Sequence, residues 1–138
     1  NLNLAVSNIA GYTDIFFQKK LSKISTINKE KSLKIFQGKI NTKKIVCKTL
    51  TEIIDGTIYK DKKINFLNID AEGHDLEVLQ SLNYDKYLPE VICVEIFPDQ
   101  GNFENFNLKT TPEYKFLLNK NYELYWSGFF SHIFKMTK

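Results

Sequence analysis

The chain has 138 residues, of which 43% are hydrophobic and 14% aromatic, and its formal charge is only +3. This composition suits one domain over residues 1–138 with a packed core, and it argues against a disordered chain. No apolar run approaches the roughly 20 residues of a membrane-spanning helix, so we expect no membrane partner. All 19 basic residues are lysines. Because arginine is the usual residue for bidentate contacts to phosphate and guanine, we expect no nucleic-acid partner either.

The two cysteines, Cys47 and Cys93, lie far apart in apolar runs and form no CxxC pair. They give no support to a zinc site or a thioredoxin-type site, and they are typical of buried thiols in a reducing compartment. We therefore expect a cytoplasmic location. The chain shows no secretory leader, and it begins with Asn rather than Met, which suggests a segment upstream.

The first third of the chain predicts strands separated by a polar stretch. Residues 2–9 and 13–17 have the apolar runs of short strands, the second of them at a sheet edge. Residues 18–43 are polar, rich in lysine and weakly patterned, which favours a long loop or a hairpin excursion over a phosphate-binding arm. Residues 43–50 restore a strand pattern.

The clearest unit is a strand, a helix and a second strand. INFLNID (64–70) has the near-continuous apolar character of a strand buried on both faces. A turn at Gly73 leads to HDLEVLQSL (74–82), whose leucines recur at helical spacing, and VICVEIF (91–97) reads as a second buried strand. This succession predicts a βαβ crossover in which the two strands run parallel.

Two further helices are predicted on either side of that unit. TLTEIID (49–55) resembles a short helix that Thr49 or Thr51 could cap, and residues 111–121 begin with Thr-Pro, a common helix start.

The chain ends with two strand patterns, YELYW and FFSHIFKM, separated by Ser-Gly. They predict an antiparallel hairpin. The elements together predict an α/β fold with a mostly parallel sheet that closes on an antiparallel C-terminal strand pair.

Carboxylates gather where the strands of the central unit end. Asp70 and Glu72 directly follow the first strand, and Glu95 lies at the end of the second. Ligands of open α/β sheets bind beyond the carboxyl ends of the strands, so these groups could bind a polar acceptor, take up a proton or hold a cation. Alternatively, Glu72 could accept backbone hydrogen bonds in the turn, and Asp75 could support the helix start.

Two common nucleotide-binding classes find no support. A nucleoside triphosphatase needs a glycine-rich loop that ends in Lys and Ser or Thr, and a dinucleotide-binding fold needs GxGxxG. The six glycines of this chain are scattered singly and form neither motif.

INFLNIDAEGHDLEVLQSLNYDKYLPEVICVEI, about residues 64–97, resembles the signature region of FkbM-type S-adenosylmethionine-dependent methyltransferases. That family carries an apolar strand, Asp-x-Glu-Gly, an acidic helix start with spaced leucines, and a Pro-preceded strand that ends in Glu. NLAVSNIAGYTDIFF and VCKTLTEII are similar to the segments that precede this region in the family.

The resemblance implies a Rossmann-like methyltransferase sheet whose last strand reverses direction. Such domains hold the methionine part of the cofactor on a glycine-rich loop after their first strand, and an acidic residue after the second strand grips the ribose. This sequence has neither, and its first strand resembles the family's third. The chain therefore looks like the C-terminal part of the domain, with the N-terminal βαβ units missing. An exposed sheet edge would then favour self-association.

The resemblance also implies methyl transfer from S-adenosylmethionine, most plausibly to a hydroxyl of a sugar or another small metabolite. Asp70 is the expected base or hydroxyl-orienting group, with Glu72 in support and His74 as an alternative base. His74 could instead only cap its helix. Ser7 and Asn8 are expected near the adenine side, and Asp70 near the methyl group. A divalent ion held by Asp70 and Glu72 is possible but not favoured.

A second hypothesis is a non-catalytic fragment or partner subunit that retains the fold and only binds or associates. An upstream segment with a strand and a GxGxG-like loop would favour the enzyme instead.

Phe103 and Phe106, in an aromatic loop, could cover the acceptor or simply pack against the sheet.

Overall fold

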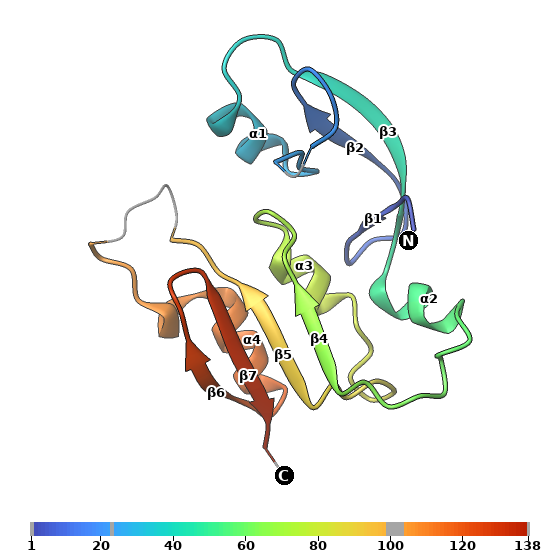
Figure 1. Cartoon of the computed structure of the whole chain (residues 1–138), viewed down its shortest axis with the longest axis vertical. Coiled ribbons are helices and arrows are strands. Elements are labelled where there is room, and N and C mark those ends of the chain that lie inside the picture. Colours follow the sequence, from blue (N-terminus) through green and yellow to red (C-terminus); the bar gives the residue numbers. More distant parts are fainter. Residues whose placement is uncertain (1, 23, 99–103, 138) are drawn as a thin grey trace.

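The computed structural model describes residues 2–22, 24–98 and 104–137, which form an α/β fold with two mixed sheets (Figure 1). The first sheet has the strand order β1-β3-β2 and consists of β1 (Ala5–Val6), β2 (Gly11–Phe17) and β3 (Asn41–Lys48). The second has the order β4-β5-β7-β6 and consists of β4 (Phe66–Ile69), β5 (Val91–Glu95), β6 (Tyr122–Ser127) and β7 (Ser131–Met136).

The described residues also form four α-helices and a short 3₁₀ helix. They are α1 (Lys29–Ile35), α2 (Leu50–Asp55), α3 (Asp75–Gln80), α4 (Pro112–Asn119) and η2 (Leu108–Thr110). None of the helices in this part of the chain is long and apolar enough to cross a membrane.

The predicted βαβ unit is confirmed. β4 and β5 pair in parallel, with Ile69 opposite Val94. The next residue along each strand is Asp70 and Glu95, so the two carboxylates emerge at the same edge of the sheet.

The expectation of one mostly parallel sheet is wrong for the described residues. Only β4 with β5 and β1 with β3 pair in parallel, whereas the pairs β2–β3, β5–β7 and β6–β7 are antiparallel. The antiparallel C-terminal hairpin is confirmed. The connection between β6 and β7 spans only residues 128–130, and it can only return the chain antiparallel, because parallel strands need a crossover of a dozen or more residues.

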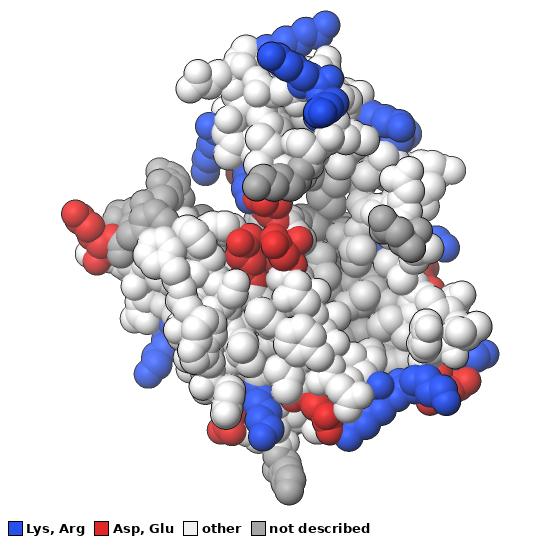
Figure 2. Space-filling view, in the orientation of Figure 1, with Lys and Arg blue, Asp and Glu red and all other residues white. Residues whose placement is uncertain are grey.

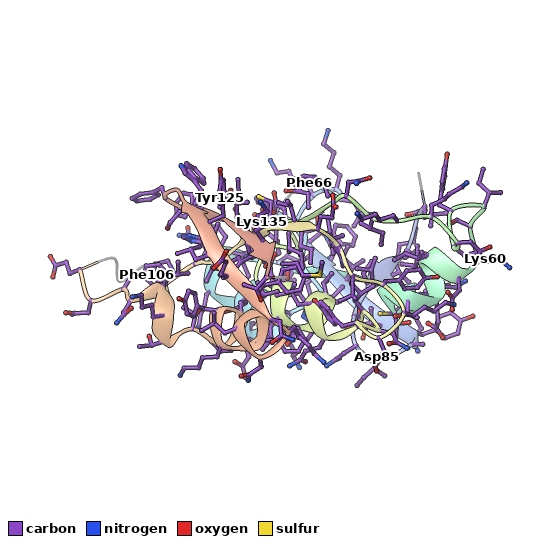
Figure 3. All side chains as sticks on the ribbon, turned by 90° about the horizontal axis from the view of Figure 1, so that it is seen from below. Lys60, Phe66, Asp85, Phe106, Tyr125 and Lys135 are labelled. Atoms are coloured by element: carbon purple, nitrogen blue, oxygen red, sulfur yellow. The ribbon has the colours of Figure 1, made fainter. Side chains whose placement is uncertain are left out.

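The four-stranded sheet is covered by helices on one face. Figure 3 shows α3 and α4 on that side, while Phe66, Tyr125 and Lys135 project from the other. β4 lies at the edge of this sheet, and Phe66 is 57% exposed, so the interpretation of residues 64–70 as a strand buried on both faces is wrong. A run of apolar residues does not by itself distinguish a central strand from an edge strand.

The core lies between this sheet and its two helices. Its fully buried members come from both layers and are Leu79, Ile92, Val94, Leu117, Tyr122 and Phe134. Alternate residues of β5 face this core, as a half-covered sheet requires.

The two helix starts predicted around the central unit are confirmed. Thr49 rather than Thr51 caps α2, in a capping box with Glu52, and Thr111 caps α4 with Pro112 at the first position. The Thr51 hydroxyl instead donates to the carbonyl of Ser81, which fastens α2 to the end of α3.

The polar stretch 18–43 is a hairpin excursion, as one alternative predicted, but it carries α1, which the weak pattern did not reveal. Asn28 caps this helix through its side chain, which accepts from the backbone N–H of Lys31 at 2.9 Å. An asparagine before a run of good helix formers was the signal that could have found it.

Candidate functional site

The turn that follows β4 has an unusual backbone. Glu72 and Gly73 both adopt positive φ, at 52° and 82°. The buried carboxylate of Asp75 closes the turn, since Oδ1 accepts from the N–H of Ala71 at 2.9 Å and Oδ2 from that of Gly73 at 3.1 Å. Burial raises the pKa of Asp75, and the two backbone hydrogen bonds oppose that rise. Asp75 therefore shapes the site, in agreement with its alternative structural role.

Lys31 of α1 lies over this turn. Its Nζ is 3.2 Å from Oε2 of Glu72 and 5.4 Å from the ring centroid of Phe97. A Cβ at Gly73 would lie 3.0 Å from Cδ of Lys31, so the glycine allows both the backbone conformation and the approach of the lysine. Sequence reasoning missed Lys31 because it missed the helix.

A groove of about 830 Å³ lies beside Lys31, and acidic side chains from α1, the turn after β4, α3, β5 and α4 line it: Glu30, Glu72, Asp75, Glu95 and Glu113. Figure 2 shows acidic side chains gathered above the ends of β4 and β5. Burial, followed by the negative charges of Asp70, Asp75 and Glu72, raises the pKa of Glu95 to about 7. Among the described residues, Oε2 of Glu95 is buried without a hydrogen-bond partner. This carboxyl group can therefore hold a proton near neutral pH.

A second groove of about 330 Å³ lies between β1 and β4. Its walls are mostly apolar, and Asn68, Asp70 and His74 supply its polar groups from the β4 side. Asp70 and Glu72 thus line different grooves, although only one residue separates them. A joint role of these two carboxylates at one ligand stays a prediction.

Ser7 is in direct contact with His74, which lines the second groove. The Ser7 hydroxyl lies 2.8 Å from Nε2 of His74, and Nδ1 of His74 lies 3.4 Å from Oε2 of Glu77. His74 is the N-cap residue of α3, as the alternative predicted, but its side chain makes no capping hydrogen bond. The Ser7 backbone N–H donates to the carbonyl of Lys48 at 3.1 Å, which fixes the serine beside β3.

Asn8 directly follows Ser7, but its side-chain amide bonds to a different residue. Its Nδ2 donates to Oε1 of Gln80 at 3.1 Å. The structure therefore brings Ser7 into contact with His74, places His74 and Asp70 on the same groove, and places Asn8 against the end of α3. The adenine-side role of Ser7 and Asn8 stays a prediction.

Among the described residues, no group of three or more His, Cys, Asp or Glu side chains is arranged to hold a metal ion. Cys47 and Cys93 are free thiols, and burial raises the pKa of both. Phe106 packs against the core cluster, which agrees with the structural alternative for the aromatic loop. Phe103 lies outside the described residues.

These features define an α/β protein with a polar site at the carboxyl edge of a parallel strand pair, where ligands of such sheets bind. The model of the FkbM methyltransferase domain matches residues 1–124, so the chain belongs to the FkbM methyltransferase family. Searches among curated proteins and among solved structures each found no significant match.

Proposed function

We propose that the chain is the C-terminal part of a Rossmann-like, S-adenosylmethionine-dependent O-methyltransferase domain. The acceptor we propose is a hydroxyl of a sugar or another small metabolite. Family membership supports the methyl transfer, and the observation that carries the assignment of residues is the exposed Asp70 at the end of β4, beside a groove.

The groove between β1 and β4 suits S-adenosylmethionine by its chemistry. Its volume of about 330 Å³ lies at the lower end of the range for small-molecule sites. Apolar walls suit an adenine ring, and the carboxylate of Asp70 suits a positively charged ligand. Ser7 and Asn8 would contribute a hydroxyl and an amide on the β1 side. When bound, S-adenosylmethionine supplies a methyl group on a positively charged sulfur atom.

Asp70 would accept the proton of the acceptor hydroxyl and hold that hydroxyl in line for displacement. Glu95 emerges beside Asp70, and its pKa of about 7 leaves it protonated over part of the physiological range. A protonated Glu95 beside an ionised Asp70 avoids placing two negative charges at adjacent strand ends. Glu72 is held by Lys31 and would support the site from the neighbouring groove.

The first test is a calorimetric titration of S-adenosylmethionine into the chain and into the Asp70→Ala variant. Asp85→Ala is the matched control, because Asp85 is an exposed aspartate in the turn between α3 and β5. Saturable binding that Asp70→Ala weakens and Asp85→Ala preserves supports the proposal. A folded chain that releases no heat would instead favour the non-catalytic fragment or partner subunit.

For the complete enzyme we expect Asp70→Asn to lower kcat by about 10²- to 10⁴-fold, the usual contribution of a general base. An unchanged kcat would remove Asp70 from the chemistry.

Two further proposals concern the location of the protein and its self-association. We propose a cytoplasmic location, since both cysteines are free. We also propose self-association at β4 or β6, the two outer strands of the second sheet. Sedimentation equilibrium over a range of concentrations tests the second point, and a constant monomer mass would contradict it.

A further inference from the structure

Three side chains outside the first groove lie in series, and a hydrogen bond joins the first two. The hydroxyl of Ser7 is 2.8 Å from Nε2 of His74, and Nδ1 of the same ring is 3.4 Å from a carboxylate oxygen of Glu77. A hydroxyl, an imidazole and a carboxylate in this order are the parts of a base-activated serine.

The contacts select the tautomer that such a serine needs. The carboxylate of Glu77 can only accept a hydrogen bond, so it favours the ring with the proton on Nδ1. Nε2 is then left with a lone pair that accepts from the Ser7 hydroxyl. Oδ1 of Asn8 is a competing acceptor for this hydroxyl, but at 3.3 Å it is farther away than Nε2.

The surroundings of Ser7 suit an apolar acyl group. Ser7 is only 8% exposed, and its neighbour Val6 lines the groove between β1 and β4 together with His74. The apolar walls of that groove come from strands of both sheets, from α3 and from the residue before β1, and they include Leu4, Val6, Leu67, Ile69 and Val78. A volume of about 330 Å³ admits a short acyl chain.

The chain contains an internal comparison. Ser127 also bonds a histidine, with its hydroxyl 2.8 Å from Nδ1 of His132. The other ring nitrogen of His132 is buried without a hydrogen-bond partner among the described residues, so no carboxylate orients this ring. Burial also lowers the pKa of His132. The second pair therefore has the serine–histidine distance of the first but lacks its third member.

We propose that Ser7 is a nucleophile, activated by His74 and oriented through Glu77, that takes the acyl group of a small ester. The Oγ atom forms a bond to the carbonyl carbon while its proton passes to Nε2 of His74. As the ester C–O bond breaks, the leaving alcohol receives that proton. A water molecule then repeats the sequence on the acyl-serine and releases the carboxylic acid.

The test is covalent labelling of the whole chain without S-adenosylmethionine, so it is independent of the proposed methyl transfer. A fluorophosphonate and 4-nitrophenyl acetate are the probes, and intact mass with peptide mapping locates the adduct. We expect an adduct at Ser7 that forms at least about tenfold faster than any at Ser127, and its absence from Ser7→Ala.

Three variants separate activation from accessibility. His74→Gln should slow labelling at Ser7 by about 10²-fold or more, and Glu77→Gln by a smaller factor, since loss of a general base costs more than loss of its orienting group. Ser7→Cys keeps a nucleophile in place if Ser7→Ala fails to fold, and it should carry the adduct on sulfur.

The proposal is overturned if the wild-type chain gains no adduct, or if Ser127 labels as fast as Ser7. Labelling of Ser7 at an unchanged rate in a folded His74→Gln variant would also overturn it.

Discussion

The N-terminal region, residues 2–48 as described, and the C-terminal region differ in how they are packed. The C-terminal region has the core, with six fully buried hydrophobic side chains in its hydrophobic cluster. Buried apolar residues of the N-terminal region are Phe36 and Cys47, while many of its large apolar side chains are exposed: Leu2, Ile9, Tyr12, Leu21, Ile24, Leu33, Ile35 and Val46. The candidate site lies where the thinly packed region meets the well-packed one.

The side-chain hydrogen bonds that join these regions are also contacts of the site. In the described part of the chain they are Ser7 with His74, Asn8 with Gln80, and Lys31 with Glu72. Regions with few buried apolar contacts open more easily than packed cores, and binding elements are commonly drawn from them. A ligand in either groove would therefore add contacts where the molecule has the fewest.

The largest effect should come from the core, and two helical leucines test the difference in packing directly. Leu117 of α4 is fully buried, whereas Leu33 of α1 is 63% exposed. We predict that Leu117→Ala lowers the free energy of unfolding by about 2–5 kcal/mol and Leu33→Ala by less than about 0.5 kcal/mol. Urea unfolding measures both, and equal losses would contradict the comparison.

The next effect concerns the turn that holds the site. Gly73→Ala places a side chain at a φ of 82° and against Lys31, so we predict a loss of about 1–2 kcal/mol in the free energy of unfolding. Gly56→Ala is the matched control: its φ is −79° and its added Cβ meets only ordinary contacts, so it should be neutral or stabilising. Combining Gly73→Ala with Lys31→Ala should reduce the loss from the first change. Full additivity would show that Lys31 does not crowd the glycine.

Glu95 should make the stability of the folded chain depend on pH, with a sign opposite to that expected for a surface carboxylate. Its pKa rises from 4.5 to about 7 in the folded chain, so between these values the folded state binds more protons than the unfolded state. Stability therefore falls as pH rises through this window. We predict that Glu95→Gln makes the curve of Tm against pH flatter there.

Glu90→Gln is the control for that measurement. A hydrogen bond from Lys63, and another from Asn65, lowers the pKa of Glu90, so its contribution is present above its unfolded pKa and is lost as pH falls through its folded pKa. The change at Glu90 should leave the slope between about pH 5 and 7 intact. A Glu95→Gln curve that coincides with the wild type would show that this carboxyl titrates normally.

The two regions also differ in how far the sequence predicted them. The unit from β4 to β5 was predicted because its leucine spacing, turn glycine and apolar runs all agree, and local agreement of this kind specifies a fold strongly. α1 was missed because Lys29, Lys31 and Lys34 dilute its apolar pattern and it buries little surface. The order of the strands in the two mixed sheets was not predictable, since the sequence pattern of a strand does not indicate which strands lie beside it.

Within the site, too, some features could be predicted from the sequence and others could not. The strand-end carboxylates Asp70 and Glu95 could be placed from register, because parallel strands end at a common edge. The contact of Ser7 with His74 joins residues 67 positions apart and depends on how the two sheets meet. No local spacing contains that information.

The smallest effect concerns Lys31, which links α1 to the site through a partly buried ion pair with Glu72. Pairs of this exposure contribute about 0.2–1 kcal/mol, so we predict that Lys31→Met speeds amide hydrogen exchange in α1 by up to about fivefold. Exchange in α4 should not change, because its amides report on the C-terminal core. Lys34→Met is the control, since Lys34 lies on the same helix and lines the same groove. If Lys34→Met speeds exchange as much as Lys31→Met, the ion pair is not what holds α1, and helix propensity alone accounts for its protection. If amide exchange in α4 speeds up together with that in α1, the two regions open together. Their difference in packing then does not give them separate stabilities.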